Sequence, residues 1–340
     1  MNIRHITKAG ISNQFEDILH IIQNARIKAL QSVNEHLVNL YWQVGEIISK
    51  KVASAAWGNK TVDELADYIR KNNPELKGFN RRGLYRMKQF YECYHQIENV
   101  SSMLTQISWS SHLTILSKTK TIEEKKFYIN LAIHEKYSVR ELDRQISSSL
   151  FERQLLSDKK VTTVLTQLHP HAADVFRDSY VFEFLDLPSV YSENDLRNIL
   201  LGNLKNVILE LGKDFIFVAK EFRLQVGTHD FYIDLLFYHR DLCCLVAFEL
   251  KTVTFKPEFL GQLNFYLEAL DRDIKKQHEK PSIGVLLCKG KDSEVVEYAL
   301  SRSLSPAMIA EYSLKLPDKK LLLDKLHQLE DYQNDIKNTP

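Results

Sequence analysis

Three charged residues interrupt two otherwise apolar stretches of this 340-residue chain, and they constrain its fold more than any other feature. Asp234 lies within residues 231–238, Glu249 lies near the end of residues 242–250, and Lys251 follows directly. Both stretches predict β-strands of a buried sheet. A charge in such a strand destabilises the fold unless it is paired or binds a metal.

The spacing of these residues is compatible with metal chemistry. Glu249 and Lys251 are two residues apart, so their side chains share one face of the strand. Two converging carboxylates suit a hard cation such as Mg²⁺, and a lysine beside them can orient the attacking water of a phosphodiester hydrolysis. A purely structural buried ion pair fits the spacing equally well. A tight turn through Arg240 would place Asp234 opposite Val246, so a bulge, a strong twist or a bridging metal must join the two acids.

The next predicted helix, over residues 257–270, carries two polar side chains on one face. Gln262 and Tyr266 are four residues apart in the sequence and therefore adjacent on the helix surface. Their amide and hydroxyl could contact a substrate backbone or a metal-bound water. An amphipathic helix that packs Tyr266 into the core explains the same spacing. The pair therefore indicates a functional site only in combination with the three charged residues.

This combination resembles the RecB-like branch of the PD-(D/E)xK nucleases. The likeness extends to the YhcG-type family of bacterial nuclease-domain proteins and covers nearly the whole chain. The stretches that carry it are Phe231-Tyr-Ile-Asp-Leu-Leu-Phe-Tyr-His-Arg240, Phe255-Lys-Pro-Glu258, Gly261-Gln-Leu-Asn-Phe-Tyr266, Ile283-Gly-Val-Leu-Leu-Cys288, Ile107-Ser-Trp-Ser110 and Ser138-Val-Arg-Glu-Leu142.

The resemblance implies an α/β, restriction-endonuclease-like C-terminal domain that hydrolyses DNA with Mg²⁺ or Mn²⁺. The residues that match its site are Asp234, Glu249, Lys251, Gln262 and Tyr266. The two acids would bind the metal with the backbone carbonyl of Leu250, and the lysine would position the attacking water. By analogy alone, cleavage would serve restriction, defence or the processing of mobile-element DNA.

Many members of this superfamily carry a further glutamate on the first helix of the core. The helix predicted over residues 192–211 offers Glu193, Asp195 and Glu210, and Arg197 stands where a relative is expected to carry Glu. We take Glu210 and Glu193 as candidates for this metal-site acid, although the helix dipole alone favours acids near a helix start. Either another acid serves or the site has only two carboxylates, and the second case supports the alternative of a catalytically inactive DNA-binding or assembly protein that keeps the nuclease fold.

Hydrophobic spacing predicts the rest of a mixed sheet flanked by helices. The strand–helix–strand step from Cys243 to Cys288 favours a parallel pair with a right-handed crossover. Further strands are expected at residues 215–226, 282–288 and 308–314, and further helices at residues 292–302 and 321–336.

The first half of the chain has apolar residues three and four apart and no alternating pattern, which predicts an all-helical domain. The chain length favours two domains. We place a helical domain for DNA or partner binding at residues 1–155 and the nuclease domain at residues 156–340. Thr61, Asn80 and Ser138 are predicted helix N-caps.

Residues 61–94 predict a helix–turn–helix with a basic second helix. Its basic residues, with no acid between them, are Lys77, Arg81, Arg82, Arg86 and Lys88. They could bind DNA phosphates. A solvated basic face fits equally well, because the formal net charge of the chain is only +1.

The remaining features concern compartment and partners. The four cysteines form no CxxC pair and no zinc-binding spacing. Residues 1–10 contain no apolar signal-peptide core, and no run of about 18 apolar residues occurs. We therefore expect a cytoplasmic DNA-binding protein that is not inserted in a membrane, and both homo-oligomers and protein partners are compatible with the sequence.

Overall fold

The computed structural model describes residues 8–54, 57, 59–97 and 101–337. Its internal contacts divide the chain into two compact units, Met1–Ile146 and Ser147–Pro340. Residues 1–7, part of the segment without a predicted signal-peptide core, lie outside the described part. No helix of the described part is long and apolar enough to cross a membrane.

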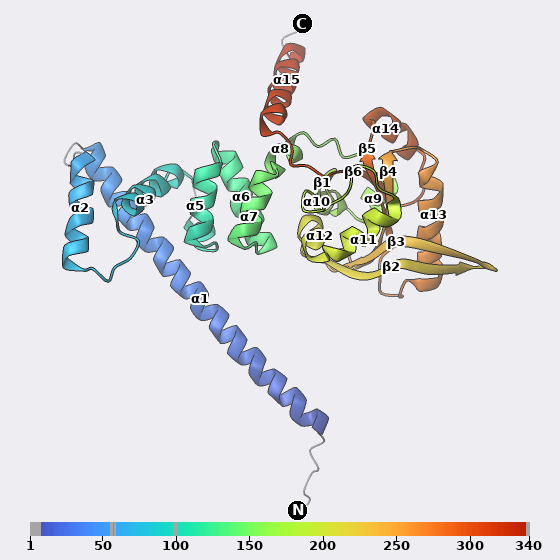
Figure 1. Ribbon diagram of the computed structural model, residues 1–340, viewed down its shortest axis with the longest axis horizontal. Helices are drawn as coiled ribbons and strands as arrows, with labels where there is room; N and C mark the ends of the chain where they lie inside the picture. The colour runs from blue at the N-terminus through green and yellow to red at the C-terminus, as the bar shows by residue number, and fades with distance from the viewer. Residues whose placement is uncertain (1–7, 55–56, 58, 98–100, 338–340) are drawn as a thin grey trace, which may run out of the picture. The chain divides into compact units, whose positions relative to one another are not determined.

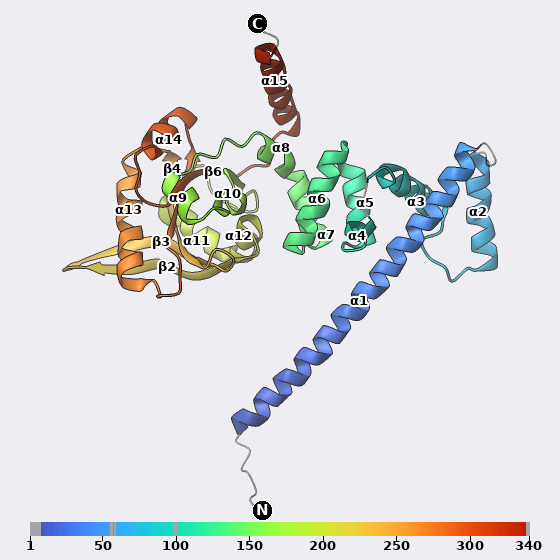
Figure 2. The same ribbon diagram turned by 180° about the vertical axis from the view of Figure 1, so that it is seen from behind.

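The described part of the first unit is helical, as predicted. α1 (Lys8–Ala53) is one helix of 46 residues, and both views show it extending far beyond α3, which packs along it (Figure 1, Figure 2). Buried Ile48, Leu84 and Met87 join these two helices and α2 in one apolar cluster. The other helices of this unit are α2 (Asn59–Asn72), α3 (Arg81–Tyr94), α4 (Ser101–Leu104), α5 (Trp109–Lys118), α6 (Ile122–Glu135) and α7 (Val139–Ser147).

Two of the three predicted N-caps are confirmed. Asn80 Oδ1 accepts a hydrogen bond from the backbone N–H of Gly83 at 2.9 Å, and Ser138 Oγ accepts one from Glu141 at 3.2 Å. The prediction for Thr61 is wrong, because α2 already begins at Asn59 and Thr61 therefore lies inside its first turn.

A six-stranded mixed sheet forms the centre of the second unit, in the order β1-β6-β5-β4-β3-β2. The meander β2-β3-β4 is antiparallel, whereas β4-β5, β5-β6 and β1-β6 are parallel, as predicted for the first of these pairs. β1 was not predicted because three residues are too few for an alternating pattern. The strands are β1 (Ser179–Val181), β2 (Phe215–Val226), β3 (His229–His239), β4 (Cys244–Thr254), β5 (Ile283–Gly290) and β6 (Ala307–Ser313).

Helices flank this sheet, and one helix prediction is corrected. Residues 192–211 form two helices rather than one, because Gly202 disfavours the helix and the Asn203 side chain donates to the carbonyl of Ile199 at 3.1 Å. The helices of this unit are α8 (Leu150–Leu155), α9 (Thr163–Leu168), α10 (Ala172–Val175), α11 (Glu193–Gly202), α12 (Leu204–Leu211), α13 (Phe259–Ala269) with its π-helical extension η1 (Leu270–Ile274), α14 (Ser293–Leu300) and α15 (Lys319–Lys337).

The sheet carries an apolar core on each face. Phe248 of β4 belongs to the core shared with α11 and α12, and Ala247 belongs to the core shared with α13 and α14. Because side chains alternate along a strand, Glu249 and Lys251 continue the face of Ala247. The two charged residues therefore lie on the side of the sheet that α13 covers.

Candidate active site

The hairpin between β3 and β4 brings the two predicted acids level with each other. His239 pairs with Cys244 and Leu235 pairs with Phe248, so one further step sets Asp234 level with Glu249. The expectation that Asp234 lies opposite Val246 is wrong. The turn contains four residues, 240–243, and Cys243 adopts a left-handed φ of 52° there. This longer turn shifts the register by enough to align the acids without a bulge between β3 and β4.

Lys251 is held between two glutamates. Its Nζ lies 3.0 Å from Glu249 Oε1 and 3.2 Å from Oε2 of Glu193, the first residue of α11. It also lies 5.4 Å from the centre of the Phe259 ring. Burial lowers the pKa of the Lys251 ammonium, but attraction to both glutamates outweighs burial and the net direction is upward. Lys251 therefore remains a cation at neutral pH.

Asp234 uses both of its carboxylate oxygens. Oδ2 accepts a hydrogen bond from the backbone N–H of Leu250 at 2.9 Å, and Oδ1 is paired with Nη1 of Arg197. The other terminal nitrogen of Arg197 lies 3.0 Å from Glu221 Oε1 and 2.9 Å from Asn194 Oδ1. Arg197 thus bridges Asp234 to a second carboxylate.

Glu221 places that second carboxylate on β2. Lys220 pairs with Leu235 and Phe222 with Ile233, so Glu221 is level with Asp234. Its φ of 44° is in the left-handed region, which is uncommon for a residue other than glycine. Such strained positions cluster at functional sites. Neither Glu221 nor the bridging role of Arg197 was predicted, because the charges along β2 and α11 do not indicate that these two side chains meet.

Glu249 has a raised pKa and one carboxylate oxygen without a described partner. Burial and the nearby charge of Asp234 raise its pKa to about 7, although Lys251 opposes the shift. Its Oε2 is buried and has no hydrogen-bond partner among the described residues. An anionic oxygen in this position lacks the partner that a buried charge requires. A divalent cation held by Glu249 and Asp234 would supply one, so these residues fit a metal once Arg197 leaves Asp234 Oδ1.

The raised pKa of Glu249 predicts an unusual pH dependence of stability. Between the ordinary value of 4.5 and about 7, the folded protein holds a proton that the unfolded chain releases, so stability falls as pH rises. Glu249→Gln removes this penalty. In EDTA at about pH 8, the melting temperature of the variant should be several degrees above that of the wild type. At about pH 4 the two melting temperatures should be equal. A difference in melting temperature that does not change with pH contradicts this prediction.

α13 places the predicted helix motif beside the acids. Gln262 Nε2 donates to the hydroxyl of Tyr266 at 2.6 Å, and Tyr266 is buried whereas Gln262 is exposed. Burial raises the pKa of Tyr266, the bond from Gln262 lowers it, and the charges of Glu249 and Asp234 raise it further. Its hydroxyl therefore stays protonated at neutral pH and can donate a hydrogen bond.

The structure does not bring Glu210 to this cluster. Glu210 is fully buried on α12, where it accepts a hydrogen bond from Val181 of β1 at 2.9 Å. It also pairs with Arg177 at 3.1 Å and Arg153 at 3.6 Å. Because β1 is the far edge strand of the sheet, Glu210 is a structural counter-ion there. Of the two predicted acids, Glu193 joins the site.

Two protein families and one relative match this chain. Residues 173–327 match the family described as the YhcG PDDEXK nuclease domain, and residues 17–153 match the DUF1016 N-terminal domain. "Putative nuclease YhcG" of Escherichia coli (strain K12) is 31% identical over 358 aligned positions, which cover 94% of this chain and 94% of the relative. The chain belongs to the YhcG nuclease family. Nucleases of the PDDEXK type generally depend on a divalent metal ion.

Solved structures resemble part of this YhcG-family chain. The crystal structure of a repair endonuclease from Pyrococcus abyssi has a TM-score of 0.26 and 16% identity, over 38% of this chain and 50% of that one. The EndoMS–dsDNA2 complex has a TM-score of 0.26 and 19% identity, over 39% of this chain and 48% of that one. The match therefore spans about half the length of each solved chain.

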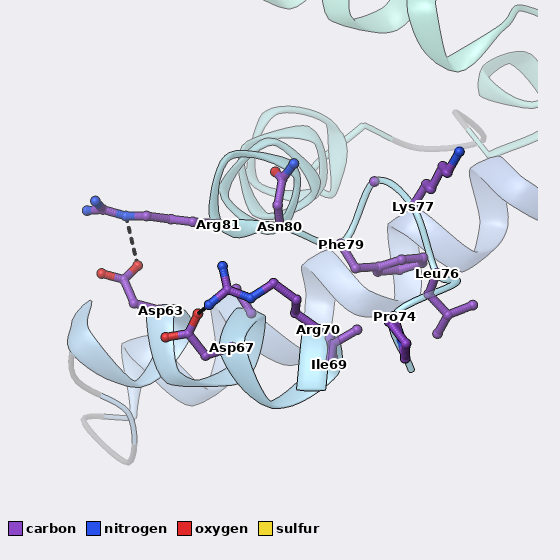
Figure 3. Close-up of a pocket in the computed structure, with 12 residues that line it drawn as sticks. Asp63, Asp67, Ile69, Arg70, Pro74, Leu76, Lys77, Phe79, Asn80 and Arg81 are labelled. Atoms are coloured by element: carbon purple, nitrogen blue, oxygen red, sulfur yellow. Dashed lines mark hydrogen bonds and ion pairs between the residues drawn. The ribbon is translucent and has the colours of Figure 1, made fainter. Parts of the chain in front are cut away.

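The N-terminal domain of this family member carries the predicted basic residues. Arg81 pairs with Asp63 at 2.8 Å and Lys88 with Glu92 at 2.7 Å, which partly compensates both charges. Lys77 and Arg81 line a hollow of about 540 Å³ between α2 and the start of α3 (Figure 3). Binding of nucleic acid through a helix–turn–helix stays a prediction.

Proposed function

We propose that the chain is a Mg²⁺- or Mn²⁺-dependent deoxyribonuclease. The observation that carries this proposal is the buried cluster of Asp234, Glu249 and Lys251, in which one oxygen of Glu249 lacks a partner among the described residues. In ion pairs that serve only structure, most buried carboxylate oxygens are hydrogen-bonded. The cluster instead holds an unsatisfied carboxylate beside a lysine, within a PDDEXK nuclease domain.

The residues of the cluster would have different roles in metal binding and in hydrolysis. Asp234 and Glu249 would hold the cation. The carbonyl of Leu250 would join them, because the N–H and C=O of one strand residue point to the same side and its N–H already faces Asp234. A bound Mg²⁺ or Mn²⁺ supplies a polarised phosphoryl oxygen and a more acidic water. Lys251 would orient that water and stabilise the added negative charge at phosphorus, with Glu193 fixing its ammonium.

Gln262 and Tyr266 would position the substrate. The exposed amide of Gln262 can reach a DNA backbone while it keeps the Tyr266 hydroxyl in place. Arg197 would act as a counter-ion that holds Asp234 before the cation arrives. Because Arg197 already contacts Glu221, its guanidinium can remain paired with this second carboxylate when it leaves Asp234.

Metal-dependent cleavage tests the proposal directly. Purified full-length protein is incubated with supercoiled plasmid in Mg²⁺, in Mn²⁺ and in EDTA. We expect cleavage in either metal and none in EDTA, because without a cation the two acids cannot activate a water. Cleavage that persists in EDTA, or plasmid that stays intact in both metals, contradicts the proposal.

A catalytically inactive DNA-binding protein is the second candidate. Two observations favour it: Arg197 occupies one oxygen of Asp234, and no group of three or more His, Cys, Asp or Glu side chains in the described part is arranged to hold a metal. This candidate predicts that the protein shifts DNA in a gel and leaves the plasmid intact in both metals.

We also propose that the basic residues around α3 bind DNA phosphates. Arg82 is exposed and Arg86 half-buried, and both add to the charge of Arg81. Changing all three to alanine should weaken a gel shift and flatten its salt dependence, because fewer phosphate contacts release fewer counterions. Arg140→Ala, at an exposed position on α7, serves as the control. Equal binding by the triple variant and the wild type contradicts this role.

A further inference from the structure

α1 exposes an apolar stripe along most of its length. Phe15 is 61% exposed, Leu30 is 70% exposed and Val33 is 57% exposed, although each is a large hydrophobic residue. The members of this stripe, which we call the α1 stripe, are Phe15, Leu19, Ile22, Leu30, Val33, Leu37 and Leu40. A contiguous exposed apolar surface of this kind marks an interaction site.

The spacing of the α1 stripe is that of a helix-pairing seam. Its members are three or four residues apart, with Arg26 filling the one gap in the series. Repeats of this kind keep one face of a helix against a partner helix, and an extra four-residue step is tolerated as a local unwinding. The spacing therefore favours packing of the α1 stripe against another helix rather than against a flat surface.

The free part of α1 ends where the helix meets its own domain. Asn34 donates hydrogen bonds to the carbonyls of Thr105 and Ile107 at 2.9 Å and 3.0 Å, and the buried residues of α1 begin at Val38. Residues 15–32 are all exposed. This exposed stretch is about 26 Å long.

The charges of this segment favour a second copy of the chain in antiparallel orientation. A parallel in-register pair would set Arg26 against Arg26, and like charges at a seam are destabilising. An antiparallel pair centred on residue 21 matches Glu16 with Arg26, in both directions at once. Such reciprocal contacts are what a two-fold dimer requires.

We propose that the chain dimerises through the α1 stripe, with residues 15–27 of two copies packed antiparallel about residue 21. Leu19 and Ile22 form the centre of the contact. The stem of each Arg26 covers Phe15 of the second copy, while its guanidinium pairs with that copy's Glu16. The dimer joins two nuclease domains in one particle whether or not the site is active.

Sedimentation of the full-length protein at micromolar concentrations tests the contact. We expect a dimer for the wild type and for Lys251→Ala, and a monomer for Leu19→Glu with Ile22→Glu. Gln31→Glu, at an exposed position on the opposite side of α1, should stay dimeric. Circular dichroism and a melting curve verify that each variant is folded. A monomeric wild type, or a folded Leu19→Glu, Ile22→Glu dimer, overturns the proposal.

Charge reversal tests the orientation. Glu16→Arg and Arg26→Glu should each raise the dimer dissociation constant by about tenfold or more, because each sets like charges together. The double variant should return to within about threefold of the wild type. A double variant that dissociates as readily as the single variants overturns the antiparallel register.

Discussion

Lys251→Ala should lower the rate of metal-dependent DNA cleavage by about 10²–10⁴-fold. The ammonium lies 3.0 Å from Oε1 of Glu249, so its charge is beside one of the two proposed metal ligands. Alanine removes both the group that would orient the water and the charge that would stabilise the transition state. Cleavage of a labelled duplex under single-turnover conditions measures the chemical step directly.

The matched control for this variant is Lys205→Ala, at an exposed position on α12. It removes the same charge from the same unit and should cleave as the wild type does. The dissociation constant for DNA in Ca²⁺ should change little in Lys251→Ala, because the loss falls on the transition state. A Lys251→Ala protein that cleaves within about threefold of the wild type would remove this lysine from the mechanism.

Glu210→Gln should destabilise the protein by about 3–5 kcal/mol, without any direct effect on the site. Glu210 is fully buried and pairs with Arg177 and Arg153, which are themselves largely buried. Neutralising the acid leaves two buried guanidinium charges without this counter-ion. Urea denaturation followed by circular dichroism measures the loss.

Glu193→Gln is the matched variant that separates a site acid from a structural one. Its side chain is 41% exposed, so its removal should change the free energy of unfolding by less than about 1 kcal/mol. Cleavage should nevertheless fall, because Lys251 loses one of its two carboxylate partners. If Glu193→Gln unfolds readily while Glu210→Gln stays stable and loses cleavage, the assignment of the two acids is wrong.

The architecture of the second unit could be predicted because its signals are local. Apolar stretches at β3, β4 and β5 mark buried strands, and the helix between β4 and β5 requires a parallel crossover. The two predictions that were wrong, the β3–β4 register and the single helix over residues 192–211, depend on one or two residues each. The turn at residues 240–243 set a register that spacing alone placed elsewhere, and Gly202 with Asn203 divided one predicted helix into α11 and α12.

The site was predictable in part for the same reason. Asp234, Glu249 and Lys251 stand out as charges within apolar strands, so their convergence followed once the strands were paired. Glu221 reaches Asp234 through the pairing of β2 with β3, and Glu193 and Arg197 reach the site through the packing of α11 against the sheet. No spacing along the chain encodes such a contact.

The position of bound Mn²⁺ tests the central claim most directly. Crystals of the full-length protein grown with Mn²⁺ are measured at the manganese absorption edge, where anomalous scattering locates the ion. We predict one ion bound by the carboxylates of Asp234 and Glu249, with Lys251 beside it and Arg197 moved to Glu221. An ion bound elsewhere, with Arg197 still paired to Asp234, would contradict the account.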